Sequence, residues 1–132
     1  MKHYQPRKQN PYILPHHIYY ETIWKIKGYY WMKERVTDII MATPDTDGQP
    51  RGGGVSDPTY SKAVKLGDYS HVVRVIEEER DRIFPEYRKG IWDNIQHGTR
   101  YPDDADRRTY SRHKSRFVYR VAVRLGIYDD KM

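Results

Sequence analysis

The chain of 132 residues has no cysteine, only two phenylalanines and no long run of apolar residues. Without cysteine there is no disulfide framework, no thiol nucleophile and no zinc site built on thiolates. A helix that spans a bilayer needs about 18 consecutive apolar residues, and no segment of the sequence approaches that length. These absences predict a soluble protein of the cytoplasm with no membrane partner.

Acidic residues are missing from one segment, and that absence sets the charge of the whole chain. The net charge is +6, from 24 lysines and arginines against 18 acids. Residues 107–124 hold seven cations and no acid, so removing these seven charges from +6 leaves −1 for the rest of the chain. A basic segment of this kind indicates a polyanionic partner, nucleic acid above all.

Aromatic residues are plentiful, at 14% of the chain with 13 tyrosines, which favours a folded core over a disordered chain. Apolar residues recur at helical spacing outside the loops, and no strand-like alternation recurs. The length fits a single domain. The sequence therefore predicts an all-α fold, a compact bundle of about five to six helices with a C-terminal helix-turn-helix-like element.

Proline and glycine divide this single domain into five predicted segments. The density of both residues between positions 43 and 56 excludes regular structure there. In chain order the segments are an extended arm (1–14), N-terminal helices (15–42), a flexible loop (43–56), central helices (57–97) and a C-terminal DNA-binding element (98–128).

Individual residues refine these boundaries. Pro15 is expected to open the first helix, Gly28 to weaken it and Gly67 to end a helix begun at residue 57. Pro85 is expected to start another helix, His97-Gly98 to close it, and Gly126 to stop the last. The acids at 77–81 are expected on a solvated, salt-bridged face. Core anchors are expected at Trp24, Trp31 and Trp92.

The predicted helix 107–125 carries a stripe of five arginines, each four residues from the next: Arg108, Arg112, Arg116, Arg120 and Arg124. At about 100° per residue the stripe drifts about 40° per step, opposite an apolar face. Like charges at this spacing repel by roughly 0.2–0.5 kcal/mol per pair, and a phosphate backbone would reverse the sign of that energy. A solvated arginine face is the alternative interpretation.

Hydroxyl side chains in the same segment suit phosphate and base contacts. The order of a helix at 86–96, a short link and a basic helix is that of a helix-turn-helix, in which the second helix lies in the major groove. The candidate contacts to double-stranded DNA are Arg107, Arg108, Thr109, Tyr110, Ser111, Arg112, Lys114, Ser115, Arg116 and Arg120.

Other patterns of residues typical of catalytic or metal sites are incomplete. The glycine triplet at 52–54 lacks the Lys-Ser/Thr of a P-loop, which indicates a hinge. Asp103, Asp104 and Asp106 lack a partner ligand at metal-binding spacing, and Asp106 serves equally well as a helix N-cap. His16 and His17 have no partner four residues on. We therefore expect no enzyme activity, no metal site and no cofactor.

Three pieces of sequence, in this order and spacing, carry a resemblance to a known family. They are the Gly52-Gly53-Gly54-Val55-Ser56-Asp57-Pro58-Thr59 segment, the pair Ile76…Pro85-Glu86, and Arg108-Thr109-Tyr110-Ser111-Arg112…Phe117-Val118…Val121-Ala122-Val123-Arg124-Leu125-Gly126. Over about residues 15–127 the chain resembles the RinA/ArpU-type regulators of late gene transcription, encoded by phages of Gram-positive bacteria.

This resemblance implies an all-helical protein of the bacterial cytoplasm whose C-terminal part is similar to the promoter-reading region of sigma factors. It also implies activation of the packaging and morphogenesis genes. A DNA-binding packaging component similar to a small terminase subunit is the alternative, and a protein adaptor that uses the tyrosine-rich N-terminal helices is a third. RNA polymerase and a second copy of the chain are left open as further partners.

Overall fold

The computed structural model describes residues 3, 5–7, 9–42 and 57–130, with only the backbone at 39–42 and 57–67. This part of the chain holds five α-helices and no strand, which confirms the predicted all-α class for it. The predicted loop at 43–56 lies outside the described residues. In chain order the helices are α1 (His16–Lys27), α2 (Tyr29–Ala42), α3 (Asp57–Arg82), α4 (Pro85–His97) and α5 (Arg107–Arg124).

Helix boundaries fall where the sequence places proline and glycine. Pro15 occupies the N-cap of α1, and Gly28 separates α1 from α2. Pro85 is the first residue of α4, where its missing N–H costs no helical hydrogen bond. Gly98 closes α4 with a φ of 71°, a left-handed conformation that glycine adopts without strain. These four boundaries agree with the predictions to within a residue.

Both ends of α5 carry their own signals. Asp106 accepts a hydrogen bond from the Arg108 amide at 3.0 Å, which confirms the carboxylate as an N-cap. At the other end the Ile127 amide donates to the Ala122 carbonyl at 2.9 Å, across Gly126 with its φ of 73°. This bond is the long one of a Schellman motif, so glycine ends α5 as expected.

One predicted boundary is wrong. Gly67 does not end a helix, because α3 runs through it as 26 continuous residues. A glycine inside a helix costs about 1 kcal/mol relative to alanine, which a long helix packed against a neighbour can tolerate. The two helices expected on either side of Gly67 are therefore one, and the described residues hold five helices rather than six.

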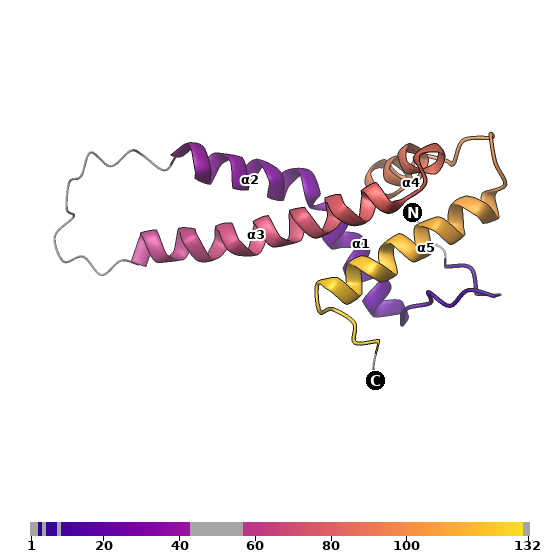
Figure 1. The fold of residues 1–132 in the computed structure, drawn as a ribbon, viewed down its shortest axis with the longest axis horizontal. Helices are drawn as coiled ribbons and strands as arrows, with labels where there is room; N and C mark the ends of the chain where they lie inside the picture. The colour runs from indigo at the N-terminus through magenta and orange to yellow at the C-terminus, as the bar shows by residue number, and fades with distance from the viewer. Residues whose placement is uncertain (1–2, 4, 8, 43–56, 131–132) are drawn as a thin grey trace.

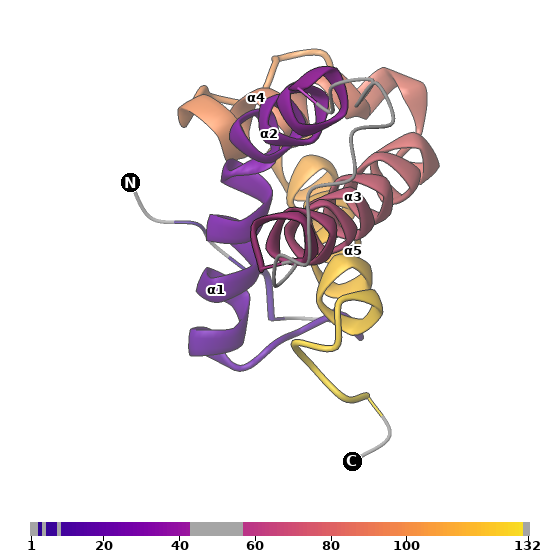
Figure 2. The ribbon, with the colours of Figure 1, turned by 90° about the vertical axis from the view of Figure 1, so that its left-hand side faces the viewer.

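The helices form a bundle at one end and an arm at the other (Figure 1). Antiparallel and side by side, α2 and α3 extend away from the rest of the molecule, whereas α1, α4 and α5 gather around the C-terminal half of α3 (Figures 1 and 2). The predicted compact bundle thus describes only the end that contains α5.

The core lies within this bundle and holds side chains from all five helices. The largest fully buried ones include Tyr19 of α1, Ile76 of α3, Ile91 of α4 and Tyr110 of α5. The apolar face predicted for α5 is confirmed: the buried side chains there include Phe117, Val118, Val121 and Ala122.

The prediction that all three tryptophans are core anchors is wrong for two of them. Trp92 is buried and donates from Nε1 to the Tyr30 hydroxyl at 2.8 Å. Trp24 and Trp31 are 66% and 54% exposed. Each of these two has a cation over its ring, Lys27 and Arg35 respectively, so both belong to a wet surface rather than to the core.

Gly90 in α4 marks the closest contact between α4 and the link that leads to α5. A Cβ at this position would lie 2.7 Å from Cδ of Pro102 and 2.9 Å from Cε1 of Tyr110. Gly90→Ala is therefore expected to lower the free energy of unfolding by about 1–3 kcal/mol, although alanine favours helix. Urea unfolding checks this, with Gly28→Ala as the control.

The control is informative because a Cβ at Gly28 meets its nearest atom, the Lys25 carbonyl oxygen, at an ordinary 3.4 Å. Gly28→Ala is expected to leave stability unchanged or to raise it by about 0.4–1 kcal/mol through the unfolded state. If both variants were equally stable, α4 could not pack against Pro102 and Tyr110 as the structure has it.

Candidate nucleic-acid interface

Helix α5 divides lengthwise into a buried and an exposed side. Its buried side packs against α1, α3 and α4. Arg107, Arg108, Arg112 and Arg116 lie on the exposed side. We call the last three, which follow one another at four-residue spacing, the arginine ridge. Among the described residues no carboxylate lies within ion-pair distance of any of the three.

The other two arginines of the stripe are paired with α3. Nε of Arg120 lies 2.8 Å from Oε1 of Glu79, and Nη1 of Arg124 lies 3.0 Å from Oε2 of the same carboxylate. Nη2 of Arg124 also lies 2.6 Å from Oε1 of Glu78. The drift of the stripe about the helix axis accounts for this, because it carries the C-terminal arginines round to face α3.

Glu79 corrects the prediction of a solvated acidic face at 77–81. Its side chain is 2% exposed, whereas Glu78 beside it is exposed. A buried carboxylate needs charged partners, and Arg120 and Arg124 supply them across the α3–α5 contact. Arg120, a predicted DNA contact, is thus already engaged within the protein.

Four further predicted contacts lie inside the protein. Tyr110, Ser111, Lys114 and Ser115 are all buried, between 0% and 5% exposed. They occupy the side of α5 that faces the other helices, so a DNA strand on the exposed side does not reach them. Thr109 is half-buried. Of the predicted contacts, Arg107, Arg108, Arg112 and Arg116 remain on the open surface.

Lys114 is the most unusual of these buried groups. Its ammonium nitrogen lies 2.7 Å from Oδ1 of Asn94 and 2.9 Å from Nδ1 of His3. Burial, together with the charge of Lys27, lowers the pKa of Lys114 to about 7. Burial and the charge of Lys114 lower the pKa of His3 to about 4, so the imidazole is neutral at physiological pH and its Nδ1 can accept a hydrogen bond from the lysine ammonium.

The two buried serines of α5 differ in a way that allows a prediction. The Ser115 hydroxyl has no hydrogen-bond partner among the described residues, whereas the Ser111 hydroxyl is near enough to the Tyr101 phenol to oppose the rise in its pKa that burial causes. Ser115→Ala is therefore expected to leave stability unchanged or raise it by about 1 kcal/mol, and Ser111→Ala to lower it by about 1 kcal/mol. Urea unfolding of the two variants checks both signs.

Neither substitution is expected to change DNA affinity once folding is corrected for. A loss of DNA binding in Ser115→Ala, with stability intact, would place this hydroxyl on the DNA and contradict its buried position.

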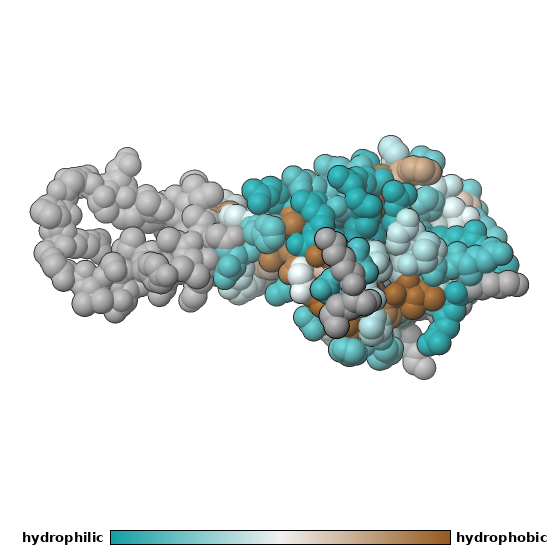
Figure 3. All heavy atoms as spheres, turned by 60° about the horizontal axis from the view of Figure 1, so that its bottom comes forward, coloured by the Kyte–Doolittle hydropathy of each residue, from teal (hydrophilic) through white to brown (hydrophobic). Residues whose placement is uncertain are grey.

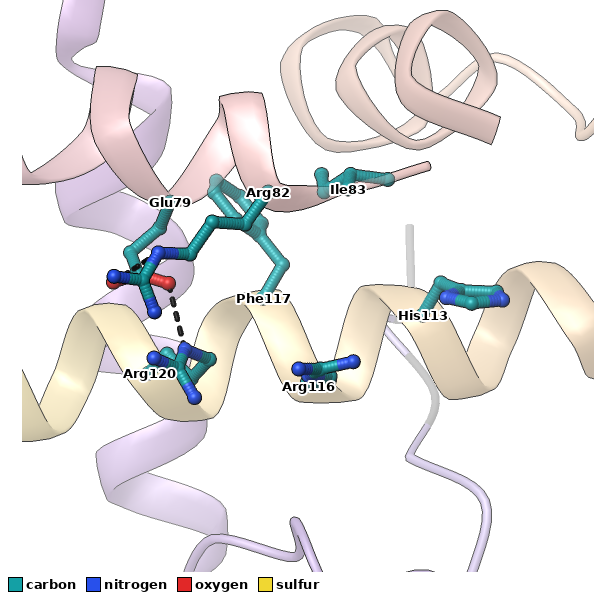
Figure 4. A pocket seen from close by; sticks show the side chains of 7 residues that line it. All are labelled: Glu79, Arg82, Ile83, His113, Arg116, Phe117 and Arg120. Carbon is teal, nitrogen blue, oxygen red and sulfur yellow. Dashed lines mark hydrogen bonds and ion pairs between the residues drawn. The ribbon is translucent and has the colours of Figure 1, made fainter. Parts of the chain in front are cut away.

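A hollow opens between the end of α3 and the middle of α5, beside the arginine ridge (Figure 4). Phe117 and Ile83 form its apolar lining, and Glu79 lies within it. The cationic and imidazole side chains around it are Arg82, Arg116, Arg120 and His113. Burial and the charge of Arg116 lower the pKa of His113. We refer to this depression, lined by these residues of α3 and α5, as the α3–α5 hollow.

Helices α4 and α5 cross steeply: α4 runs along the line of sight in Figure 1, whereas α5 lies in the plane of the picture. The link between them, residues 98–106, is longer than the three or four residues of a helix-turn-helix turn. The helix-turn-helix element is therefore not confirmed, although the order of the two helices is as predicted.

Other kinds of site are not found in the described ranges. No group of three His, Asp or Glu side chains there is placed to hold a metal ion. None of the helices in those ranges is long and apolar enough to cross a membrane. Figure 3 shows one face on which hydrophilic side chains cover most of the described surface and apolar ones emerge in small groups.

Comparison with family models, with curated proteins and with solved structures finds no match for the chain. The resemblance to RinA/ArpU-type regulators therefore stays a prediction.

Proposed function

We propose that this protein binds double-stranded DNA through the exposed side of α5. The observation that carries the proposal is the unpaired arginine ridge. Its two neighbouring pairs, Arg108–Arg112 and Arg112–Arg116, repel by roughly 0.4–1 kcal/mol in total. Glu78 and Glu79 neutralise the far end of the same stripe, whereas none of the described acids pairs with the ridge. A phosphate backbone supplies the missing anions.

The acids near the start of α5 indicate which part of the helix meets the DNA. Asp103, Asp104 and Asp106 are exposed and lie beside the first turn, with Asp104 bound to the Tyr110 hydroxyl at 2.5 Å. They repel phosphates at the N-terminal tip. The ridge points away from the buried side of α5, so the helix faces DNA along its flank over residues 108–116. In helix-turn-helix proteins, by contrast, it is the N-terminal residues of the recognition helix in the major groove that contact the bases.

Regulation of phage late genes is the role that the sequence resemblance adds to DNA binding. In this role the ridge and Arg107 hold promoter DNA, and the steeply crossed α4 and α5 act as a helix-turn-helix with a lengthened turn. The α2–α3 arm, which extends beyond the bundle, favours the alternative of a packaging component that assembles through helical arms. Light scattering separates the two, because a ring-forming component has a fixed mass of many copies.

Titration of a fluorescent DNA duplex over a series of salt concentrations tests the proposal. If the four exposed arginines of α5 each neutralise one phosphate, log affinity falls linearly with log salt with a slope of about −3 to −4. This slope is shallower than seven available cations would give, because three of the seven are buried or paired. Affinity that does not depend on salt would contradict the proposal.

A further inference from the structure

The α3–α5 hollow holds more positive charge than the acids in the described part of the chain neutralise. Its arginines, Arg82, Arg116 and Arg120, are joined by Arg124 at the same carboxylate. Against these four cations stand the two carboxylates of Glu78 and Glu79, so two of the positive charges have no ion-pair partner among the described side chains. Two further charges act on residues of this cluster, Arg74 on Glu78 and Glu86 on His113, and they are opposite in sign.

Hydrogen-bond donors are left over as well. Arg120 donates only from Nε to Glu79, so both of its terminal NH2 groups remain available as hydrogen-bond donors. Arg82 reaches Glu79 only at 4.0 Å, beyond hydrogen-bond distance, and its side chain is 59% exposed. Arg116 has no acidic partner among the described residues. In Figure 4 these side chains lie around one opening, with Arg82 coming from α3 and the other two from successive turns of α5.

The apolar lining of the hollow strengthens the electrostatic interactions of an ion that binds there. Phe117 and Ile83 are 2% and 6% exposed, so an anion in the hollow meets apolar side chains on one side. Hydrogen bonds between ions are stronger where water is partly excluded. Three guanidinium groups with free donors, two uncompensated positive charges and an apolar wall suit a tetrahedral oxyanion that carries about two negative charges.

We infer that the α3–α5 hollow is a phosphate-binding site held by Arg82, Arg116 and Arg120. The phosphate can come from two sources: the backbone of a DNA strand that lies along the arginine ridge, or a free phosphate or phosphomonoester. The first source rests on the proposed function, because Arg116 belongs to both the ridge and the hollow. The second stands without it.

Arg82 allows the site to be tested separately from the ridge, since it lies on α3. The probe is inorganic phosphate, measured by thermal unfolding against sodium chloride of equal ionic strength. Phosphate is expected to raise Tm saturably beyond the effect of chloride, as any ligand specific to the folded state does. Arg82→Gln and Arg116→Gln are each expected to weaken phosphate binding at least about tenfold.

Arg74→Gln is the matched control, because Arg74 is an exposed arginine on the same helix and its guanidinium contacts His71, which does not line the hollow. It is expected to bind phosphate as the wild type does. If phosphate stabilises no more than chloride, or stabilises Arg82→Gln as much as Arg74→Gln, the hollow is not a phosphate site.

His113 gives a second readout at the rim of the hollow. A bound phosphate dianion opposes the charge of Arg116, so it raises the pKa of the imidazole. The shift is followed by NMR titration of the histidine ring with and without phosphate, and it is expected to be absent in Arg82→Gln. A pKa of His113 that does not respond to saturating phosphate contradicts the site.

Duplex DNA distinguishes the two sources. If a backbone phosphate fills the hollow, Arg82→Gln makes the salt slope shallower by about one, whereas Arg74→Gln leaves it unchanged. If Arg82→Gln leaves the salt slope of DNA binding unchanged but weakens the binding of phosphate, the hollow binds free phosphate rather than DNA. If neither phosphate nor DNA responds to Arg82 but DNA affinity still needs Arg108 and Arg112, this inference fails and the proposed function stands.

Discussion

Replacing Lys114 with methionine is expected to remove most of the rise in stability that the wild-type protein shows between about pH 7 and pH 9.5. In the wild type this rise is expected to reach roughly 3 kcal/mol. Urea unfolding at a series of pH values measures it, because the free energy of unfolding is obtained separately at each pH.

The sign of the effect follows from the buried amine. Burial lowers the pKa of Lys114 in the folded protein to about 7, whereas an unfolded chain keeps the ordinary value of 10.5. Below pH 7 both states hold the proton, and the folded state bears the full cost of a buried charge. Between the two pKa values only the unfolded state holds the proton, so stability rises with pH.

Other groups act outside this window. The lowered pKa of His3, about 4, makes stability rise between about pH 4 and 6.5 for the same reason. Burial raises the pKa of Tyr110 to about 12, and such tyrosines lower stability only above pH 10, where the unfolded chain loses their protons first. The range from 7 to 9.5 therefore isolates Lys114.

Lys25→Met is the control, because Lys25 is an exposed lysine of α1 and is expected to leave the pH dependence unchanged. If Lys114→Met still gained stability from pH 7 to 9.5 as the wild type does, the amine would be hydrated in the folded protein. The contacts to His3 and Asn94 would then be wrong.

Helices were predictable from this sequence where a residue type decides the backbone. Pro15, Pro85, Gly98 and Gly126 each allow one backbone conformation or forbid another, and the boundaries follow them. The helix end predicted at Gly67 was wrong because glycine only weakens a helix, and the packing of α2 along α3 outweighs that cost. The α2–α3 arm depends on contacts between segments that are distant in the sequence, and local sequence patterns do not encode such contacts.

The site was only half predictable for a similar reason. Helical spacing correctly separates the arginine stripe from the apolar face, but it does not show that α3 neutralises Arg120 and Arg124. Small polar residues such as Ser115 look like surface residues in a sequence, whereas here they line a close helix contact. The position of Lys114 was predictable, because at about 100° per residue it falls on the apolar arc, between Val121 and Val118.

Removing the arginine ridge is expected to have the largest effect on DNA binding. The variant Arg108→Gln, Arg112→Gln and Arg116→Gln takes away three exposed cations that pair with no acid in the described part of the chain. The salt slope is expected to flatten by about 2.7 and affinity at about 50 mM salt to fall by two to three powers of ten. Stability is expected to hold or rise slightly, since two repelling pairs disappear.

A charge-matched variant separates the ridge from net charge. Lys25→Gln, Arg74→Gln and Lys89→Gln also remove three exposed cations, so both triple variants lower the net charge from +6 to +3. If overall charge alone drove binding, the two variants would lose affinity equally.

A titration of duplex DNA with these two triple variants over one salt series therefore tests most directly whether DNA binds along the arginine ridge. The ridge variant is expected to lose nearly the whole salt slope, whereas the charge-matched variant is expected to keep a slope within about one of the wild type. Equal slopes for the two variants, or a ridge variant that binds as the wild type does, would show that α5 presents a solvated arginine face and that DNA does not bind there.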